Sequence, residues 1–206
     1  MARYTGPVCK QCRRERQKLF LKGARCYTGK CAIEKRPYPP GLHGRARIRE
    51  SEYMIQLREK QKARRFYGIL EKQFRRYYTE ASRMKGVTGE NLLQLLELRV
   101  DNVVYRAGFA GSRAQARQLV SHGHVTINNK KVTVPSYRLR AGDVVQFREK
   151  SRDMVPLRHA IDTAPPPPAW ITVDPTVARA EIAALPTRDQ VDVPVQESLI
   201  VELYSK

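Results

Sequence analysis

Long apolar runs are missing from this sequence. No stretch approaches the roughly 18 apolar residues that a membrane-spanning helix needs, and no apolar segment follows Arg3 to form a signal peptide. We therefore expect a cytosolic chain. Because the cytosol keeps thiols reduced, structural disulfides are not expected in it.

Catalytic motifs are missing as well. No two glycines stand two residues apart, so there is no G-x-G loop, and neither G-K-[ST] nor H-E-x-x-H occurs. The sequence also shows no isolated set of an acid, a nucleophile and a base of the kind that catalysis uses. These absences predict that the chain is not an enzyme.

Acidic residues are scarce. The chain has 39 Lys and Arg against 20 Asp and Glu, a formal net charge of +19. After His159 three cations face seven anions, a net −4, so the first 159 residues carry +23. A charge of this size is best tolerated beside a polyanion, which indicates nucleic acid first and an anionic membrane surface second.

Cysteine is absent after Cys31. The four cysteines form two close pairs, Cys9 with Cys12 and Cys26 with Cys31, separated by 13 residues. Two such pairs can surround one zinc with four thiolates, and a site closed by four protein ligands is structural. An iron–sulfur cluster also uses four cysteines, and free thiols or two disulfides are the remaining alternative. A DNA-binding finger is disfavoured, because no C-x2-C…H-x3-H pattern occurs.

A proline-rich loop follows the cysteines. Residues 36–44, RPYPPGLHG, contain three prolines and two glycines, which exclude a helix or a central strand. Arginines at 45, 47 and 49 come next, and no acid follows the loop until Glu50. We expect this extended, cationic segment to contact phosphates, and a solvated linker is the alternative.

Three helices are expected between residues 51 and 97. Ser51 is suited to cap the first, and Gly68 and Gly86 interrupt the pattern before Thr88 begins the third. The first helix is crowded with Lys and Arg, so we expect it to contact phosphates, although such faces are often only solvated.

Residues 112–147 change from a helical pattern to a strand pattern. Ser112 and Gln115 form a capping box, and from His124 the apolar residues alternate with period two. Asn128 and Asn129 form a turn, which leads to a second strand at residues 130–134 and a third at 144–147. The combination predicts an α+β fold.

The C-terminal segment differs in composition. Residues 165–168 are four prolines, a stiff spacer. Leu199, Val201 and Leu203 then alternate with other residues, as in a strand or a packed extended end. The net negative charge of this segment indicates a surface that faces protein rather than RNA.

Several motifs carry a resemblance to a known family. Residues 99–132, RVDNVVYRAGFAGSRAQARQLVSHGHVTINNKKV, resemble the S-four RNA-binding module. RYTGPVCKQCRRE, RPYPPGLHG, LREKQKARRFYGI and LIVELYSK are, in this order, similar to the bacterial small-subunit ribosomal protein S-four family. Four positions depart from the family pattern: Leu42, Leu70, Val100 and Asn129.

The resemblance implies an organisation in four parts. Residues 1–45 form a metal-binding knob, which holds all four cysteines, together with the basic loop, and residues 46–97 form a basic helical region. Residues 98–160 form the S-four module, with short helices and a small antiparallel sheet. Residues 161–206 form a C-terminal extension that packs back on the helical region. The full set of four cysteines implies a metal-bearing version of the family.

The resemblance also implies a function. A member of this family is a structural constituent of the small ribosomal subunit in the cytoplasm. It binds the small-subunit rRNA directly, nucleates assembly of the subunit body, lies near the mRNA entry, contacts proteins three and five, and with proteins five and twelve influences decoding accuracy. Neither a membrane nor DNA is an expected partner. An RNA-modifying enzyme that carries the module is disfavoured, because no segment remains for a catalytic domain.

We expect RNA to be contacted by cationic and aromatic side chains of the loop, the basic helices and the module. An exposed helix end is the alternative for His122 and His124, and simple solvation is the alternative for Lys130. The full set is Arg13, Arg14, Arg36, Tyr38, His43, Arg45, Arg47, Arg58, Lys62, Arg64, Arg65, Tyr67, Arg113, Arg117, His122, His124, Lys130, Lys131 and Arg138.

Overall fold

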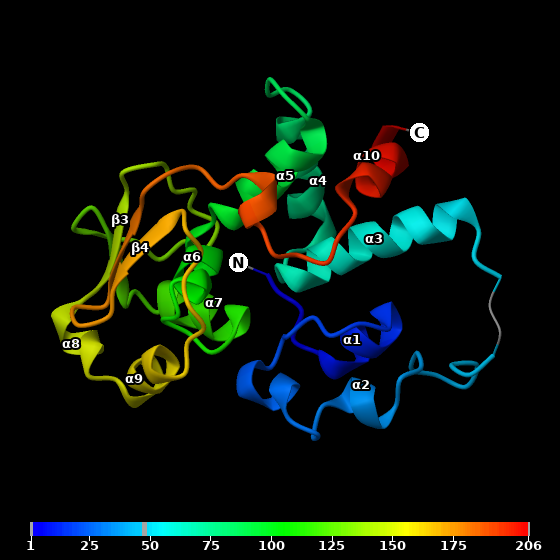
Figure 1. The fold of residues 1–206 in the computed structure, drawn as a ribbon, viewed down its shortest axis with the longest axis horizontal. Helices are drawn as coiled ribbons and strands as arrows, with labels where there is room; N and C mark the ends of the chain where they lie inside the picture. The colour runs from blue at the N-terminus through cyan, green and yellow to red at the C-terminus, as the bar shows by residue number, and fades with distance from the viewer. Residues whose placement is uncertain (1, 47–48, 206) are drawn as a thin grey trace. The chain divides into compact units, whose positions relative to one another are not determined.

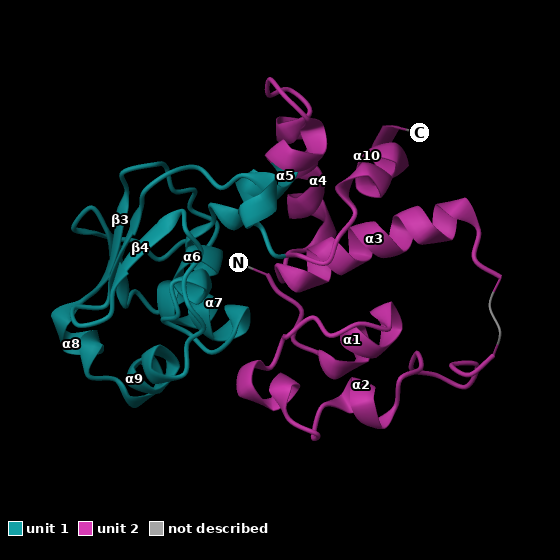
Figure 2. Cartoon of the chain, viewed as in Figure 1, with its two compact units in different colours: residues 1, 92–192 teal, residues 2–91, 193–206 magenta. Residues whose placement is uncertain are grey.

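The computed structural model describes residues 2–46 and 49–205. They form two compact units, shown in different colours in Figure 2. The sheet unit is Leu92–Asp192, and the helical unit combines residues 2–91 with residues 193–205. Residues 161–192, which the sequence analysis placed in a C-terminal extension, thus belong to the sheet unit. Among the described residues, no helix is both long and apolar enough to span a bilayer.

The helical unit begins with a small knob. Its elements are short and are joined by turns: α1 (Cys9–Glu15), η1 (Gly23–Tyr27) and α2 (Ala32–Lys35). Leu19 is fully buried, and the rings of Phe20 and Tyr27 stack with centroids 5.0 Å apart. Residues 36–46 then run as bends and turns without helix or strand, as their prolines predict. Figure 1 shows the knob and this loop in blue.

Longer helices make up the rest of the helical unit. They are α3 (Glu52–Phe66), α4 (Glu71–Ala81), the first turn of α5 (Thr88–Glu97) and α10 (Glu197–Ser205). The Ser51 hydroxyl accepts a hydrogen bond from the N–H of Met54 at 3.3 Å, so the predicted N-cap is confirmed. Phe74, Ala81 and Ile200 are fully buried in the core of this unit.

The C-terminal end is a helix, so the prediction of a strand or an extended end was wrong. Helix α10 packs along α3. Ile200 and Tyr204 lie four residues apart, on one face of a helix. The Tyr204 ring stacks on Tyr78 with centroids 4.5 Å apart, and its hydroxyl donates to Glu71 Oε1 at 2.9 Å. The alternation of Leu199, Val201 and Leu203 was misleading, because Leu199 and Leu203 are not in the core.

The sheet unit contains a five-stranded antiparallel sheet with strand order β2-β1-β3-β5-β4. Figure 1 shows α6 and α7 beside this sheet, and α8 and α9 near one end of its strands. The elements are α6 (Val100–Arg106), α7 (Arg113–Ser121), β1 (Val125–Ile127), β2 (Lys130–Lys131), β3 (Val144–Phe147), α8 (Glu149–Arg152), α9 (Val155–Asp162), β4 (Ile171–Asp174), β5 (Arg179–Ile182) and η2 (Arg188–Gln190).

The expected local signals of this unit are largely confirmed. Asn128 and Asn129 have φ values of 48° and 63°, which fits the predicted turn. The Ser112 hydroxyl accepts from the N–H of Gln115 at 3.3 Å, but the Gln115 side chain accepts from Gly111 rather than from Ser112. The second strand covers only Lys130–Lys131, shorter than the expected 130–134.

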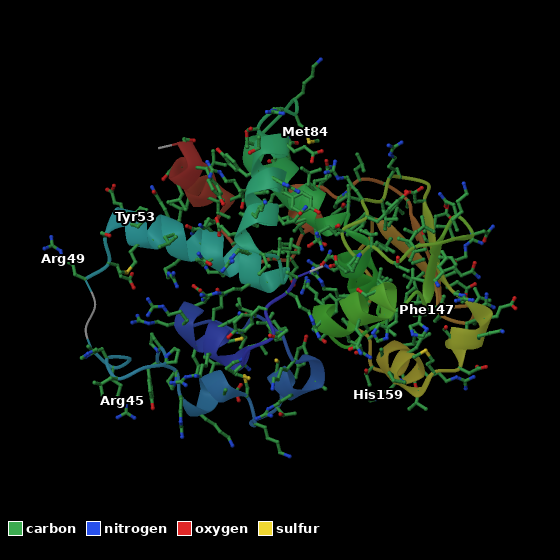
Figure 3. The ribbon with its side chains drawn as sticks, turned by 180° about the vertical axis from the view of Figure 1, so that it is seen from behind. Arg45, Arg49, Tyr53, Met84, Phe147 and His159 are labelled. Atoms are coloured by element: carbon green, nitrogen blue, oxygen red, sulfur yellow. The ribbon has the colours of Figure 1, made fainter. Side chains whose placement is uncertain are left out.

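The core of the sheet unit is aromatic and aliphatic. Trp170 is 1% exposed, and Phe109 and Phe147 are fully buried. The two phenylalanine rings meet edge to face, with centroids 5.6 Å apart and an interplanar angle of 77°. Phe147 ends β3, the middle strand of the sheet (Figure 3). Together these side chains hold the helices of this unit on the sheet.

Candidate nucleic-acid interface

The four cysteines come together in the knob. Cys9 and Cys12 lie on α1, Cys26 lies on η1, and Cys31 directly precedes α2. All four are free thiols, so the disulfide alternative does not describe this structure. They line one cavity of about 20 Å³, whose other walls are Val8, Leu21, Lys22, Arg25, Ala32 and Ile33.

Two of the four thiols, Cys12 and Cys26, have raised pKa values. Burial raises the pKa of the Cys12 thiol, and the other three cysteines raise it further. Burial likewise raises the pKa of Cys26, although the backbone N–H of Lys22 donates to its sulfur at 3.4 Å. Within residues 2–46 and 49–205, no three His, Cys, Asp or Glu side chains are placed closely enough to hold a metal ion. Four sulfurs in one small cavity are nevertheless the donor set that zinc prefers.

A second cluster joins the knob to the proline-rich loop, and we call Arg13, Tyr38 and Arg45 the Tyr38 cluster. Arg13 Nε donates to the Tyr38 carbonyl at 3.0 Å, and its guanidinium carbon lies 5.1 Å from the ring centroid. Arg45 places its guanidinium carbon 4.6 Å from the same centroid and donates to the Tyr38 hydroxyl at 3.3 Å. The hydrogen bond from Arg45 lowers the pKa of Tyr38, and the charges of Arg45, Arg36 and Arg13 add to this effect.

The described cations around Tyr38 are not paired with acids. Among the described side chains, no carboxylate forms an ion pair with Arg13, Arg36 or Arg45. Arg14 and His43 are exposed beside them. Arg45 and Arg49 are exposed as well, and their side chains are labelled in Figure 3. The predicted Arg47 lies outside the described residues. Unpaired guanidinium groups on an exposed loop are available to phosphates.

The predicted cations of α3, in contrast, form ion pairs with carboxylates. The Glu15 side chain, 1% exposed, forms ion pairs with Arg58 at 3.4 Å and with Arg65. Burial raises the pKa of Glu15, against the charges of Arg65 and Arg58. Lys62 pairs with Glu59, and Arg64 lies 3.7 Å from Glu71. These ion pairs tie α1, α3 and α4 together, and contact of the same cations with RNA stays a prediction.

Two further predicted residues are buried. Tyr67 is 3% exposed, and its ring meets Phe66 edge to face with centroids 5.3 Å apart. The Arg117 side chain is 10% exposed, with Nη1 3.6 Å from Asp101 Oδ2. Both side chains therefore act in the packing of their units, and in this conformation neither presents an open surface to a nucleotide.

Arg113 also faces α6 rather than open solvent. Its Nε donates to Asn102 Oδ1 at 2.8 Å, and its guanidinium carbon lies 4.4 Å from the centroid of the Tyr105 ring. Helical periodicity placed Arg113 and Arg117 off the apolar face of α7, yet Arg117 is buried beside Ala116 and Val120. It carried no information on Asp101 and Asn102, the polar residues that α6 presents to them.

The remaining predicted residues of the sheet unit lie at its surface. His122, Lys130, Lys131 and Arg138 are exposed. His124 is half-buried, with Nδ1 2.9 Å from the Ser151 hydroxyl. Burial lowers the pKa of His124, and the charges of His122 and Arg148 lower it further.

Arg148 is a cation that the sequence analysis missed. Its Nη1 donates to the Gly123 carbonyl at 3.5 Å, and its backbone N–H donates to the His124 carbonyl at 3.0 Å. The available signal was its place directly after the apolar end of β3, which brings it to the same edge as the start of β1. Arg148 thus lies beside His124 at one edge of the sheet unit.

Comparison with known proteins agrees with these features. The family description "Ribosomal protein S4/S9 N-terminal domain" matches residues 3–97, and the description "S4 domain" matches residues 98–145. The chain is 60% identical to the small ribosomal subunit protein uS4 of Pelobacter propionicus and 60% identical to that of Acidothermus cellulolyticus. It is 58% identical to the uS4 of Geobacter sulfurreducens, and in each case the match covers 100% of both chains. Full-length identity at this level, on a fold that contains both matched regions, shows that the chain belongs to the ribosomal protein S4 family.

Proposed function

We propose that the chain is a structural, non-catalytic constituent of the small ribosomal subunit and binds the rRNA of that subunit directly. Family membership supports the place in the subunit, since full-length relatives carry that description. The main support for the RNA contact is the group of unpaired cations around Tyr38, on a chain with a net charge of +19. The protein acts in the cytoplasm as part of the subunit.

Sedimentation tests this proposal. A tagged chain is expressed in its host, and ribosomal subunits are separated on a gradient after a high-salt wash. We expect the chain to stay with the small subunit in equimolar amount, because an integral component is held by many contacts, whereas a peripheral one is released as salt rises. A chain that runs free, or that follows the large subunit, would contradict the proposal.

Finer roles follow from the family resemblance, and we propose them on that basis. The chain nucleates assembly of the subunit body, lies near the mRNA entry and contacts proteins three and five, and with proteins five and twelve it influences decoding accuracy. Crosslinking within reconstituted subunits tests the contacts with proteins, and reporters of misreading test the effect on accuracy.

We also propose that Cys9, Cys12, Cys26 and Cys31 hold a structural zinc. The support is that all four thiols line one cavity and that no other cysteine competes for the metal. Zinc bound there supplies folding free energy to a knob whose helices are too short to be stable alone. The other possible group is an iron–sulfur cluster.

Metal analysis distinguishes these possibilities. Plasma mass spectrometry of the purified chain is expected to find stoichiometric zinc, and Cys12→Ser and Cys26→Ser are expected to lose it because a four-ligand site rarely survives the loss of one thiolate. Ser121→Ala, which removes an exposed hydroxyl in the sheet unit, serves as the control and keeps its zinc. Iron with visible absorbance would indicate the cluster instead, and a metal-free chain would overturn the proposal.

A further inference from the structure

We propose that Tyr38 is a positioning residue, which holds Arg13 and Arg45 as a preformed clamp for phosphates of the RNA backbone. The inference rests on the proposed function and deepens it, since it names the chemical group that is bound and the residue that prepares the site. Tyr38 itself, on this view, does not stack on a base. Its ring is already occupied by the two arginines.

The geometry of the cluster leaves donors free. The guanidinium carbons of Arg13 and Arg45 lie 5.1 Å and 4.6 Å from the Tyr38 ring centroid, within the range of cation–π contacts. Each group uses one hydrogen bond on Tyr38: Arg13 donates to the carbonyl and Arg45 to the hydroxyl. A guanidinium has five N–H donors in a rigid fork, so most of them remain available to an anion.

The charges of the cluster point to an anionic ligand. Two guanidinium groups converge on one ring, Arg36 is close enough to affect the same tyrosine, and none of the three forms an ion pair with a described carboxylate. On α3 of the same unit, by contrast, Arg58 and Arg65 share the buried Glu15. Like charges placed together repel one another, and a bound phosphate would remove this repulsion.

The backbone holds the clamp in place before any ligand binds. Gly44 donates its N–H to the Gly41 carbonyl at 3.2 Å, and a Cβ at Gly44 would lie 2.0 Å from the Pro39 carbonyl oxygen. The loop can therefore close tightly only with glycine at this position, and the closure brings Arg45 back over Tyr38. Arg13 is fixed from the other side, because it belongs to α1. Groups that are ordered in advance bind with a smaller entropy cost.

A phosphate of RNA fits this clamp better than an acidic peptide does. Arginine forks bind phosphate oxygens in pairs, and an RNA backbone offers such oxygens at every nucleotide. A clamp of this kind positions RNA without reading its sequence. It therefore predicts a salt-dependent contribution to affinity, and this contribution is the property to measure.

The test compares variants of equal charge. The full-length chain is titrated with small-subunit rRNA at several salt concentrations, and the slope of log K against log salt reports the phosphate contacts. Tyr38→Leu keeps the net charge but removes the ring, and we expect it to weaken binding about tenfold and to reduce the slope by about one contact or more. Tyr38→Phe keeps the ring and is expected to stay within about threefold of wild type.

Two further variants complete the design. Tyr53→Leu is the matched control, because Tyr53 is 60% exposed on α3 of the same unit (Figure 3) and we expect its loss to change neither affinity nor slope. Arg45→Lys keeps the charge but loses the planar fork, so it should weaken binding as Tyr38→Leu does. It keeps the proposal testable should Tyr38→Leu fail to fold, which circular dichroism would show.

Each outcome has a distinct meaning. A lower affinity for Tyr38→Leu and Arg45→Lys, a flatter slope for Tyr38→Leu and rescue in Tyr38→Phe support the clamp. An unchanged slope with lower affinity would mean that Tyr38 stacks on a base, which overturns it. Wild-type affinity and slope for Tyr38→Leu would mean that the ring does not prepare the arginines for a phosphate, which also overturns the proposal. If the wild-type chain itself fails to bind, the proposed function fails first.

Discussion

Asp101→Ala is expected to lower the free energy of unfolding of the sheet unit by about 3–5 kcal/mol. The Asp101 side chain is 6% exposed and lies between two buried arginines. Arg99 Nε donates to Asp101 Oδ1 at 3.0 Å and Arg99 Nη2 donates to Oδ2 at 2.6 Å, while Arg117 Nη1 lies 3.6 Å from Oδ2. Removing the carboxylate takes away a buried ion pair from each of these arginines, which costs far more than the loss of an exposed pair.

Urea unfolding followed by tryptophan fluorescence measures this effect. Trp170 is the only tryptophan of the chain and is 1% exposed in the core of the sheet unit, so its emission reports that unit. Asp153→Ala is the matched control, because Asp153 pairs with Arg158 while its side chain is 81% exposed. An exposed pair contributes only about 0–1 kcal/mol. Equal losses for the two variants would contradict the account of Asp101.

Phe147→Ala is expected to lower the free energy of unfolding of the same unit by about 3–5 kcal/mol. Phe147 is fully buried at the end of β3, and its ring meets Phe109 edge to face with centroids 5.6 Å apart. Truncation removes apolar area from the core and leaves a cavity. The middle strand of a sheet is held on both sides by its neighbours and cannot move far to fill that cavity.

The same fluorescence assay applies to this variant. Val134→Ala serves as the control, because Val134 is 49% exposed in the same unit and its loss should change stability by only about 0.5 kcal/mol or less. Phe147→Leu, which fills part of the volume, should fall between wild type and Phe147→Ala. If Phe147→Ala were as stable as Val134→Ala, the core of this unit would lie elsewhere.

Local features of the fold were predictable because they depend on neighbouring residues. Ser51 and Ser112 cap helices through the N–H of the third following residue, a contact that the spacing alone determines. The turn at Asn128 and Asn129 follows from the tolerance of asparagine for positive φ. The convergence of the four cysteines was predictable from their spacing as well, since two close pairs on a short segment have few other arrangements.

The C-terminal part was less predictable for a physical reason. Residues 199–204, LIVELY, are almost all apolar, and periodicity alone cannot assign such a short run to a strand or a helix. The packing of α10 on α3 decides between them. Likewise, β5 lies in the sheet between β3 and β4. Its partner β3 is more than 30 residues away along the chain. No local signal encodes such a pairing.

The sequence by itself determined the family, the basic character of the chain, the pairing of the cysteines and the starts of α3 and α7, because these depend on composition, motif order and short-range contacts. Only the tertiary structure decided which cations remain available to RNA. Arg58, Arg65 and Arg117 look equivalent to Arg45 in the sequence, yet the first three face buried carboxylates and Arg45 faces a tyrosine ring. The difference arises because an ion pair joins residues that are distant in the chain, and folding alone determines which acid each arginine meets.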